Sequence, residues 1–210
     1  MLECVEKFKI KLMKNFSNLL YKTTSPCLFP LLGLLIVFNS SSLFSGVPHL
    51  LKYYSYFLIS VAFILIPLAV YLLLNNLSRR IDISNNDKKI YLLGTVVLTG
   101  FITFWILQKL PNTLIVVQQF CLVTVVLGSI LALISLYWKI SVNMAAWGFI
   151  CAICAIFDYK YLGNTRLLLT ALILLSGVIA SNILYLNKNN VLQITSGYFL
   201  GLFVVLILMG

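Results

Sequence analysis

The sequence predicts an all-α protein, a bundle of helices that crosses a membrane about seven times, with six crossings as the alternative. Three observations carry this prediction. Of the 210 residues, 61% are hydrophobic. Only 10% are charged, whereas soluble domains carry about 25%. The few charged residues also leave seven long windows that contain no Asp, Glu, Lys or Arg.

Each charge-free window is a candidate for one membrane-spanning helix. A helix of about 20 apolar residues crosses a hydrocarbon core of roughly 30 Å, and its backbone groups satisfy one another within the segment. Every window comes close to that length or exceeds it. The weakest are the first, which contains the polar run Asn39–Ser42, and the fifth, which is only just long enough. The windows are 23–51, 53–78, 90–108, 110–138, 140–157, 167–187 and 189–210.

Residues 1–24 predict a basic amphipathic segment ahead of a single membrane-embedded domain at 25–210. Five lysines lie at positions 1–22, and apolar residues recur between them at close to helical spacing. A helix of this kind lies on an anionic membrane surface; a frayed basic tail is the alternative. We expect no cleavable signal peptide, because the apolar residues are interspersed with lysines.

The distribution of Lys and Arg predicts that the N-terminus is cytoplasmic. Basic residues gather in the cytoplasmic segments of membrane proteins. With seven spans and the N-terminus inside, 11 basic side chains fall on the cytoplasmic side and four on the other. The net charge of +10 therefore indicates contact with anionic lipids. Nucleic acid is not an expected partner, because basic patches interleaved with aromatic residues are missing from the sequence.

Several small residues predict close packing between helices. Gly197 and Gly201 have the small-x3-small spacing that lets two membrane helices approach closely, and Ser176 with Gly177 suits the same role. Cys151 and Cys154 form a C-x-x-C pair inside a predicted span. A redox or zinc site needs accessible thiolates and usually more ligands, so we interpret both cysteines as packing residues.

Polar residues at the ends of predicted spans are the candidates for function, because polar groups are costly in a membrane. Three such segments are Lys139–Asn143, Asn187–Gln193 and the loop 78–89. In the seven-span arrangement all three lie on the same face. Two spans separate the first two segments, so the helix starts that follow them are able to converge.

Two motifs resemble those of the type 2 phosphatidic acid phosphatase family, the membrane lipid phosphate phosphatases. That family carries P-S-G-H at the start of one span, then S-R-x5-H-x3-D and a helix with small residues. Here Ile140-Ser141-Val142-Asn143 occupies the first motif and Asn182-Ile183-x5-Asn189-x3-Gln193 the second, followed by Ile194-x-x-Gly197-x3-Gly201. The resemblance covers roughly residues 25–210. The phrases SPCLFPLLGLLIVFNS and WKIS are similar to a bacterial subgroup in which Gln replaces the Asp.

The resemblance implies a known reaction whose catalytic residues are missing here. In the family, the second-motif histidine attacks phosphorus, the first-motif histidine is the general acid, and basic side chains hold the phosphate. Asn143 and Asn189 stand at the two histidine positions, and Ile183 stands at the arginine position. A neutral amide is a poor nucleophile and delivers no proton at neutral pH. His49 is the only histidine in the chain and falls on the opposite face, so we expect the two-histidine reaction not to run.

The sequence therefore predicts an integral membrane protein with degenerate phosphatase motifs that binds a lipid phosphate. The resemblance implies a bacterial inner membrane and, as partners, anionic phospholipids or a polyprenyl phosphate, with no cofactor and no metal. Two alternatives stay open for the activity: a lipid phosphatase with a mechanism free of histidine, and a lipid transporter. Asn143 and Asn189 have the further alternative of simple helix N-caps. The candidate binding residues are Lys139, Ser141, Asn143, Ile183, Lys188, Asn189 and Gln193.

Overall fold

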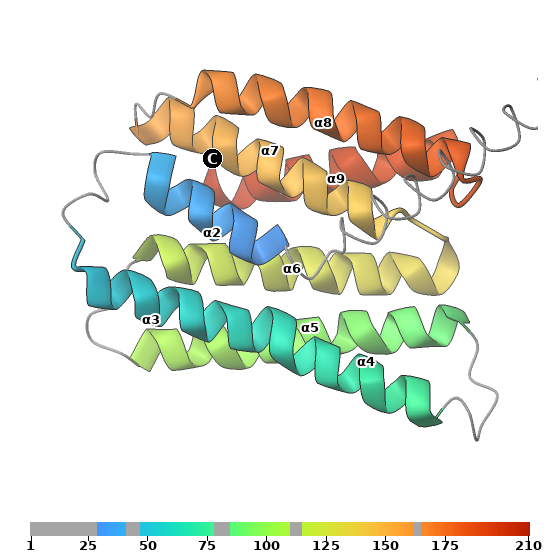
Figure 1. Ribbon diagram of the computed structural model, residues 1–210, viewed down its shortest axis with the longest axis horizontal. Coiled ribbons are helices and arrows are strands. Elements are labelled where there is room, and N and C mark those ends of the chain that lie inside the picture. The colour runs from blue at the N-terminus through green and yellow to red at the C-terminus, as the bar shows by residue number, and fades with distance from the viewer. Residues whose placement is uncertain (1–28, 41–46, 78–84, 110–114, 162–164) are drawn as a thin grey trace, which may run out of the picture.

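The computed structural model describes residues 29–40, 47–77, 85–109, 115–161 and 165–210, which form helices without any strand (Figure 1). The predicted amphipathic segment at 1–24 lies outside the described residues. In chain order the elements are α2 (Phe29–Ser40), α3 (His49–Ser60), the π-helical turn η3 (Val61–Leu65), α4 (Ile66–Leu77), α5 (Asn85–Lys109), α6 (Ile115–Tyr137), α7 (Val142–Tyr161), α8 (Arg166–Tyr185) and α9 (Val191–Met209).

Six helices in the described part of the chain are long and apolar enough to cross a membrane. The all-α membrane bundle is thus confirmed, and the protein is an integral membrane protein. Within the first charge-free window, the described helix α2 has 12 residues, which span only about 18 Å. That described length is too short for a crossing, so the part of the chain that the structure describes contains six spans, the number of the alternative. Residues 23–28 and 41–46 of the first window lie outside the described residues. The spans are His49–Asn76, Ile90–Lys109, Ile115–Tyr137, Val142–Lys160, Arg166–Tyr185 and Val191–Met209.

The first span, α3–η3–α4, is continuous but contains one wide turn. Pro67 lies two residues after this turn and has no backbone N–H to donate. The N–H of Ile66 donates to the carbonyl of Val61, five residues back, so the helix passes the proline through a π-turn. Such turns re-pair backbone groups where a regular helix would leave one unpaired.

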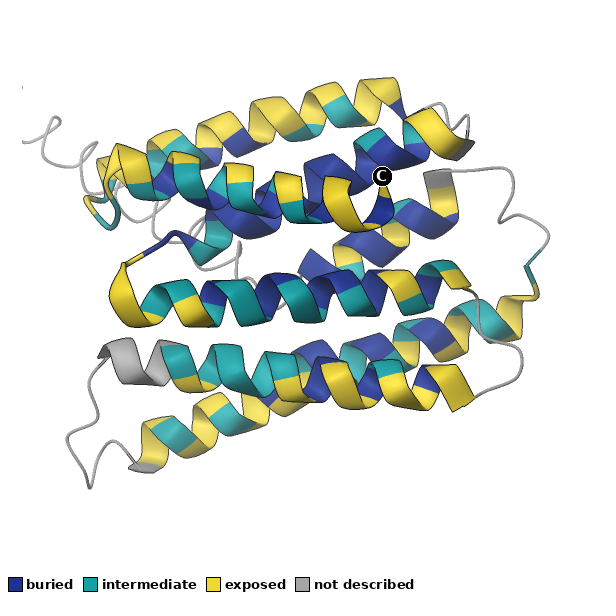
Figure 2. Ribbon diagram, turned by 180° about the vertical axis from the view of Figure 1, so that it is seen from behind, coloured by how far each residue is buried: buried dark blue, intermediate teal, exposed yellow. Residues whose placement is uncertain are grey.

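Helix α7 forms the centre of the bundle. Within its spanning segment 72% of the residues are buried, against 39% or less in each of the other five spans. Helix α9 packs along α7, α8 covers α7 from outside, and α5 pairs with α6 (Figures 1 and 2). The short α2 fits among α3, α6 and α7, where its Leu34 and Val37 are fully buried and Phe29 meets Trp147 edge to face at 5.3 Å.

Glycines bring α7 and α9 into backbone contact. A Cβ at Gly197 would lie 2.6 Å from the carbonyl oxygen of Ser141, and one at Gly201 would overlap the carbonyl oxygen of Ala145. From the other helix, a Cβ at Gly148 would overlap the carbonyl oxygen of Tyr198. The predicted packing role of Gly197 and Gly201 is confirmed. The same prediction for Gly177 is wrong, since Gly177 is exposed and a Cβ there would meet nothing within 4 Å.

The helix connections define two ends of the bundle. The turn at 138–141 between α6 and α7 and the turn at 186–190 between α8 and α9 lie at the same end, which we call the motif end. Helix α4 ends and α5 begins there too (Figure 1). Helices α3, α6 and α8 begin at the opposite end. The same-face arrangement expected for the two motif segments is therefore observed with six spans.

The cysteines that the structure describes are packing residues, as interpreted from the sequence. Cys121, Cys151 and Cys154 are buried free thiols. The side chains of Cys151 in α7 and Ser176 in α8 both interact with the hydroxyl of Tyr198 in α9, so this group links the three helices. Packing against neighbouring helices keeps these three thiols away from water.

Thiol labelling tests this arrangement. In a Cys4→Ser, Cys27→Ser variant, we expect a polar maleimide to leave the three remaining thiols unmodified in the folded protein, because the reactive thiolate needs access to water. All three should label after denaturation, which is the internal control. Labelling of Cys151 or Cys154 at the rate of the denatured protein would show instead an accessible pair. Mass spectrometry of the intact protein counts the adducts.

Candidate functional site

The starts of α7 and α9 meet at the motif end. The backbone N–H of Ser141 donates to the carbonyl oxygen of Gln193 at 3.2 Å. In the second turn of α9, Gly197 lies against the carbonyl of Ser141, and Ser141 itself is only 3% exposed. The two segments that carry the motif letters are far apart in the sequence, and they are joined here through their backbones.

The turn that leads into α9 is shaped by the way α8 ends. Asn187 has a positive φ of 51°, a conformation that Asn tolerates better than most residues. The N–H of Asn187 donates to the carbonyl of Leu184 at 2.9 Å, and the N–H of Lys188 donates to that of Ile183 at 3.4 Å. This pair of bonds is a Schellman motif, and it satisfies carbonyls that the end of α8 would leave unpaired.

The same turn brings the two candidate lysines together. The ammonium of Lys139 donates to the backbone carbonyl of Lys188 at 2.9 Å. Lys139 is exposed and Lys188 is half-buried. The α6–α7 turn is thereby tied to the α8–α9 turn by a charge-assisted hydrogen bond, and positive charge is concentrated between the starts of α7 and α9.

The start of α9 is capped by Asn190 and Gln193. Asn190 is the N-cap residue, and the side-chain oxygen of Gln193 accepts a hydrogen bond from its backbone N–H at 3.2 Å. This is the reach-back half of a capping box. The N-cap alternative for Asn189 is therefore wrong by one residue. Asn189 is half-buried in the turn before the helix.

Asn143 and Ile183 occupy different environments. Helix α7 begins at Val142, so Asn143 lies inside its first turn, half-buried, rather than at a cap position. Ile183 is a core residue with 1% exposure, in the last turn of α8. Ile183, which the resemblance matches to an arginine of the second motif, thus packs among apolar groups and does not reach the surface.

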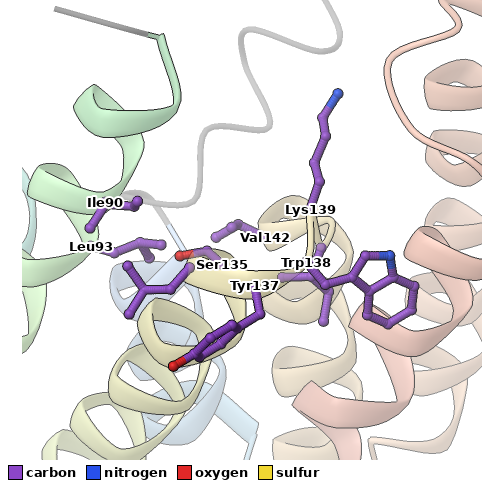
Figure 3. Close-up of a pocket in the computed structure, with 9 residues that line it drawn as sticks. Ile90, Leu93, Ser135, Tyr137, Trp138, Lys139 and Val142 are labelled. Carbon is purple, nitrogen blue, oxygen red and sulfur yellow. The ribbon is translucent and has the colours of Figure 1, made fainter.

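A cavity that sequence reasoning missed opens beside this cluster. It measures about 160 Å³ and lies between the start of α5 and the α6–α7 turn (Figure 3). The one sequence signal was the pair Trp138-Lys139 at the end of a span, because Trp and Lys concentrate at membrane interfaces. The cavity is lined by Ile90, Leu93, Ser135, Leu136, Tyr137, Trp138, Lys139, Ile140 and Val142.

The histidine and the carboxylate side chain that the structure describes both lie at the opposite end of the bundle. His49 begins α3, at the opposite end of the bundle, and is exposed. Asp158 is the only carboxylate whose side chain lies in the described part of the chain. It sits near the end of α7, also at the opposite end, and accepts hydrogen bonds from Thr165 and Arg166 at 3.3 Å. Among the described residues no group of three or more His, Cys, Asp or Glu side chains is placed to hold a metal.

The described side chains at the motif end supply neutral hydrogen-bonding groups, from Ser141, Asn143 and Asn189, and the ammonium of Lys139. Comparisons of the chain with models of known protein families, with curated proteins and with solved structures found no match.

Proposed function

We propose that this membrane protein binds a lipid phosphate at the motif end and does not hydrolyse it, as a catalytically inactive relative of the type 2 phosphatidic acid phosphatases. The observation that carries the proposal is the joining of the two motif segments. Lys139 bonds the backbone of Lys188, and Ser141 bonds the backbone of Gln193. Residues that resemble a phosphatase site in sequence are therefore neighbours in space.

Phosphate recognition at this place rests on charge and on helix geometry. The ammonium of Lys139 lies beside the starts of α7 and α9. The first backbone N–H groups of a helix have no carbonyl partner within that helix. N–H groups at a helix start favour anions, and a nearby ammonium adds a further attraction. The half-buried Asn143 and Asn189 supply amide donors from the same two segments.

Loss of hydrolysis follows from the residue types. Neither Asn143 nor Asn189 forms a phosphorylated intermediate, and neither protonates a leaving alkoxide near neutral pH. General acid catalysis alone contributes typically 10²–10⁴ in rate. The single histidine of the chain, His49, begins the helix at the far end of the bundle, about 30 Å away across a membrane.

The proposed orientation places the motif end in the cytoplasm. Beyond position 22, six Lys and Arg residues belong to the segments at this end and four to the opposite end. Basic residues concentrate on the cytoplasmic side, where the membrane surface is also more anionic. The six are Arg79, Arg80, Lys88, Lys89, Lys139 and Lys188.

Two measurements on the purified full chain test the function. We expect no phosphate release from phosphatidic acid or a polyprenyl diphosphate, and a measurable rate only from an Asn143→His, Asn189→His variant. We also expect dioctanoyl phosphatidic acid, but not dioctanoylglycerol, to raise the melting temperature, because a ligand at 100 times its dissociation constant stabilises by about 2.7 kcal/mol.

Matched variants identify the site. A Lys139→Gln, Lys188→Gln variant should lose most of the lipid-induced shift, whereas Lys160→Gln at the opposite end should keep it. Phosphate release by the native chain that disappears in Asn143→Ala or Asn189→Ala would overturn the loss of hydrolysis. Equal stabilisation by the phosphorylated lipid and by dioctanoylglycerol would overturn phosphate recognition.

A further inference from the structure

The first span consists of two helical arms joined by the π-turn η3, and the short helix α2 lies between one of these arms and α7 (Figure 1). We propose that the span bends at η3 and that α2 transmits this bend to the start of α7, so that the opposite end of the bundle controls binding at the motif end. This coupling rests on the proposed function, to which it adds a means of regulation.

The π-turn gives the middle of the first span a weak point in its backbone. In a regular α-helix the N–H of Ile66 would donate to the carbonyl of Ala62, but here it donates to that of Val61. The next residue along the chain is Pro67, which has no N–H. The π-turn thus re-pairs the N–H of Ile66 but passes over the carbonyl of Ala62. Helices bend at prolines and π-turns of this kind.

Phe63 holds this weak point against α5. Its side chain is 1% exposed, and a Cβ at Gly100 of α5 would lie 3.2 Å from the end of its ring. The arms on either side, α3 and α4, have 12 residues each. Outside the first span, the main neighbour of α3 is α2 and that of α4 is α5. A bend at η3 therefore moves α3 against α2 while α4 stays on α5.

Helix α2 connects the α3 arm to α7 through one ring contact near each of its ends. Phe38 meets Tyr56 of α3 edge to face, with ring centroids 5.3 Å apart. Phe29 meets Trp147 of α7 in the same way and at the same distance. Both phenylalanines are buried. Because a close-packed interior passes a displacement on rather than absorbing it, α2 acts as a rigid link between α3 and α7.

Trp147 lies close to the motif end of α7. It follows Asn143 by four residues, so the two side chains share one face of the helix, with Trp147 one turn deeper in the bundle. The indole is 8% exposed, and its N–H has no hydrogen-bond partner among the described residues. Packing, including the contact with Phe29, therefore positions this ring. A shift of α2 would move Trp147 and, with it, the first turn of α7, which carries Asn143.

Lipid titration tests the coupling. The melting temperature of the purified full chain in a nonionic detergent is measured against increasing dioctanoyl phosphatidic acid. We expect Tyr56→Ala, which removes the ring contact between α3 and α2, to weaken binding about fivefold or more, since couplings between distant sites are typically about 5–150-fold. Tyr53→Ala, on the same arm at a position 70% exposed, should bind as the native chain does. Pro67→Ala restores an N–H to the span and should bind at least as tightly.

Distances between spin labels test the bend itself. In a Cys4→Ser, Cys27→Ser background, Tyr53→Cys on the α3 arm and Phe101→Cys on α5 place the two labels at exposed positions. We expect two populations of label distance in the native span and one in the Pro67→Ala span. Dioctanoyl phosphatidic acid should shift the native populations toward that single distance, because a coupling between two sites is reciprocal.

The outcomes separate the coupling from the proposed function. Native-like lipid binding by Tyr56→Ala, or a single label distance in the native span that the lipid does not change, would overturn the coupling and leave phosphate recognition in place. Failure of the lipid to stabilise the native chain would overturn the proposed function together with the coupling. If Tyr56→Ala does not fold, the label distances in the native span still decide.

Discussion

Replacing Gly201 by alanine is expected to destabilise the folded protein by about 3 kcal/mol or more, the upper part of the range for overpacked sites. The new Cβ would overlap the carbonyl oxygen of Ala145 in α7. This neighbour is backbone in the central helix, so it cannot move aside as the end of a flexible side chain does. Helices α7 and α9 would have to separate, and the hydrogen bond from Ser141 to Gln193 would be lost with their contact.

Two other glycines provide matched controls for this substitution. Gly177→Ala and Gly94→Ala place the same methyl group on helices where it would meet nothing within 4 Å. We expect each to leave stability unchanged or to raise it by up to about 1 kcal/mol, because alanine is the better helix former. Unfolding in a denaturing detergent, followed by circular dichroism, measures all three variants. A Gly201→Ala protein as stable as these controls would show that the close α7–α9 contact does not form.

Replacing Ile183 by arginine is expected to prevent normal folding, although it would bring the second motif closer to that of the family it resembles. Ile183 is 1% exposed and packs in the core of the bundle. A guanidinium there loses its hydration without gaining a carboxylate, since Asp158, the described acid, lies at the other end. Uncompensated buried charge costs several kcal/mol. We expect most of the Ile183→Arg protein to aggregate when it is extracted from membranes, as size-exclusion chromatography would show.

Two control variants separate the effect of the new side chain's volume from the effect of where its charge is placed. Ile183→Leu keeps the apolar volume and should cost less than about 1.5 kcal/mol. Tyr185→Arg introduces the same guanidinium two residues later, where the side chain is 53% exposed and an arginine reaches the interface. We expect both proteins to remain monodisperse. An Ile183→Arg protein that behaves like Tyr185→Arg would mean that Ile183 faces an aqueous site.

The spans could be predicted from the sequence because absence of charge is a direct signal of burial in hydrocarbon. Six of the seven charge-free windows contain a spanning helix. The first window contains a shorter helix in its described part, and a charge-free length alone does not say how much of it is helical. The polar run that begins at Asn39 coincides with the end of α2 at Ser40. The 12-residue helix α2 therefore covers less than half of the window 23–51.

The candidate site was predictable as segments but not as contacts. Spacing placed Lys139–Asn143 and Asn187–Gln193 on one face, and the structure joins them. Asn190, rather than Asn189, caps α9 because the Schellman motif at the end of α8 sets where the turn finishes. The sequence of this turn is a run of similar polar residues, so it does not indicate that motif. Gly177 and Gly201 look alike in sequence, and only the neighbouring helix distinguishes them. The cavity combines residues from α5, α6 and α7, so no single segment indicates it.

The continuous helix formed by α3, η3 and α4 has a consequence for the bilayer around the protein. Its apolar segment His49–Asn76 has 28 residues, or about 42 Å of helix, whereas α7 and α9 each have 19 spanning residues, or about 29 Å. In a hydrocarbon layer of roughly 30 Å the shorter helices match the thickness, and the longer one must tilt or protrude. A thinner membrane would increase this mismatch most at that one helix. The thickness of the bilayer would then determine how far the first span tilts relative to the other helices, whose lengths match the bilayer.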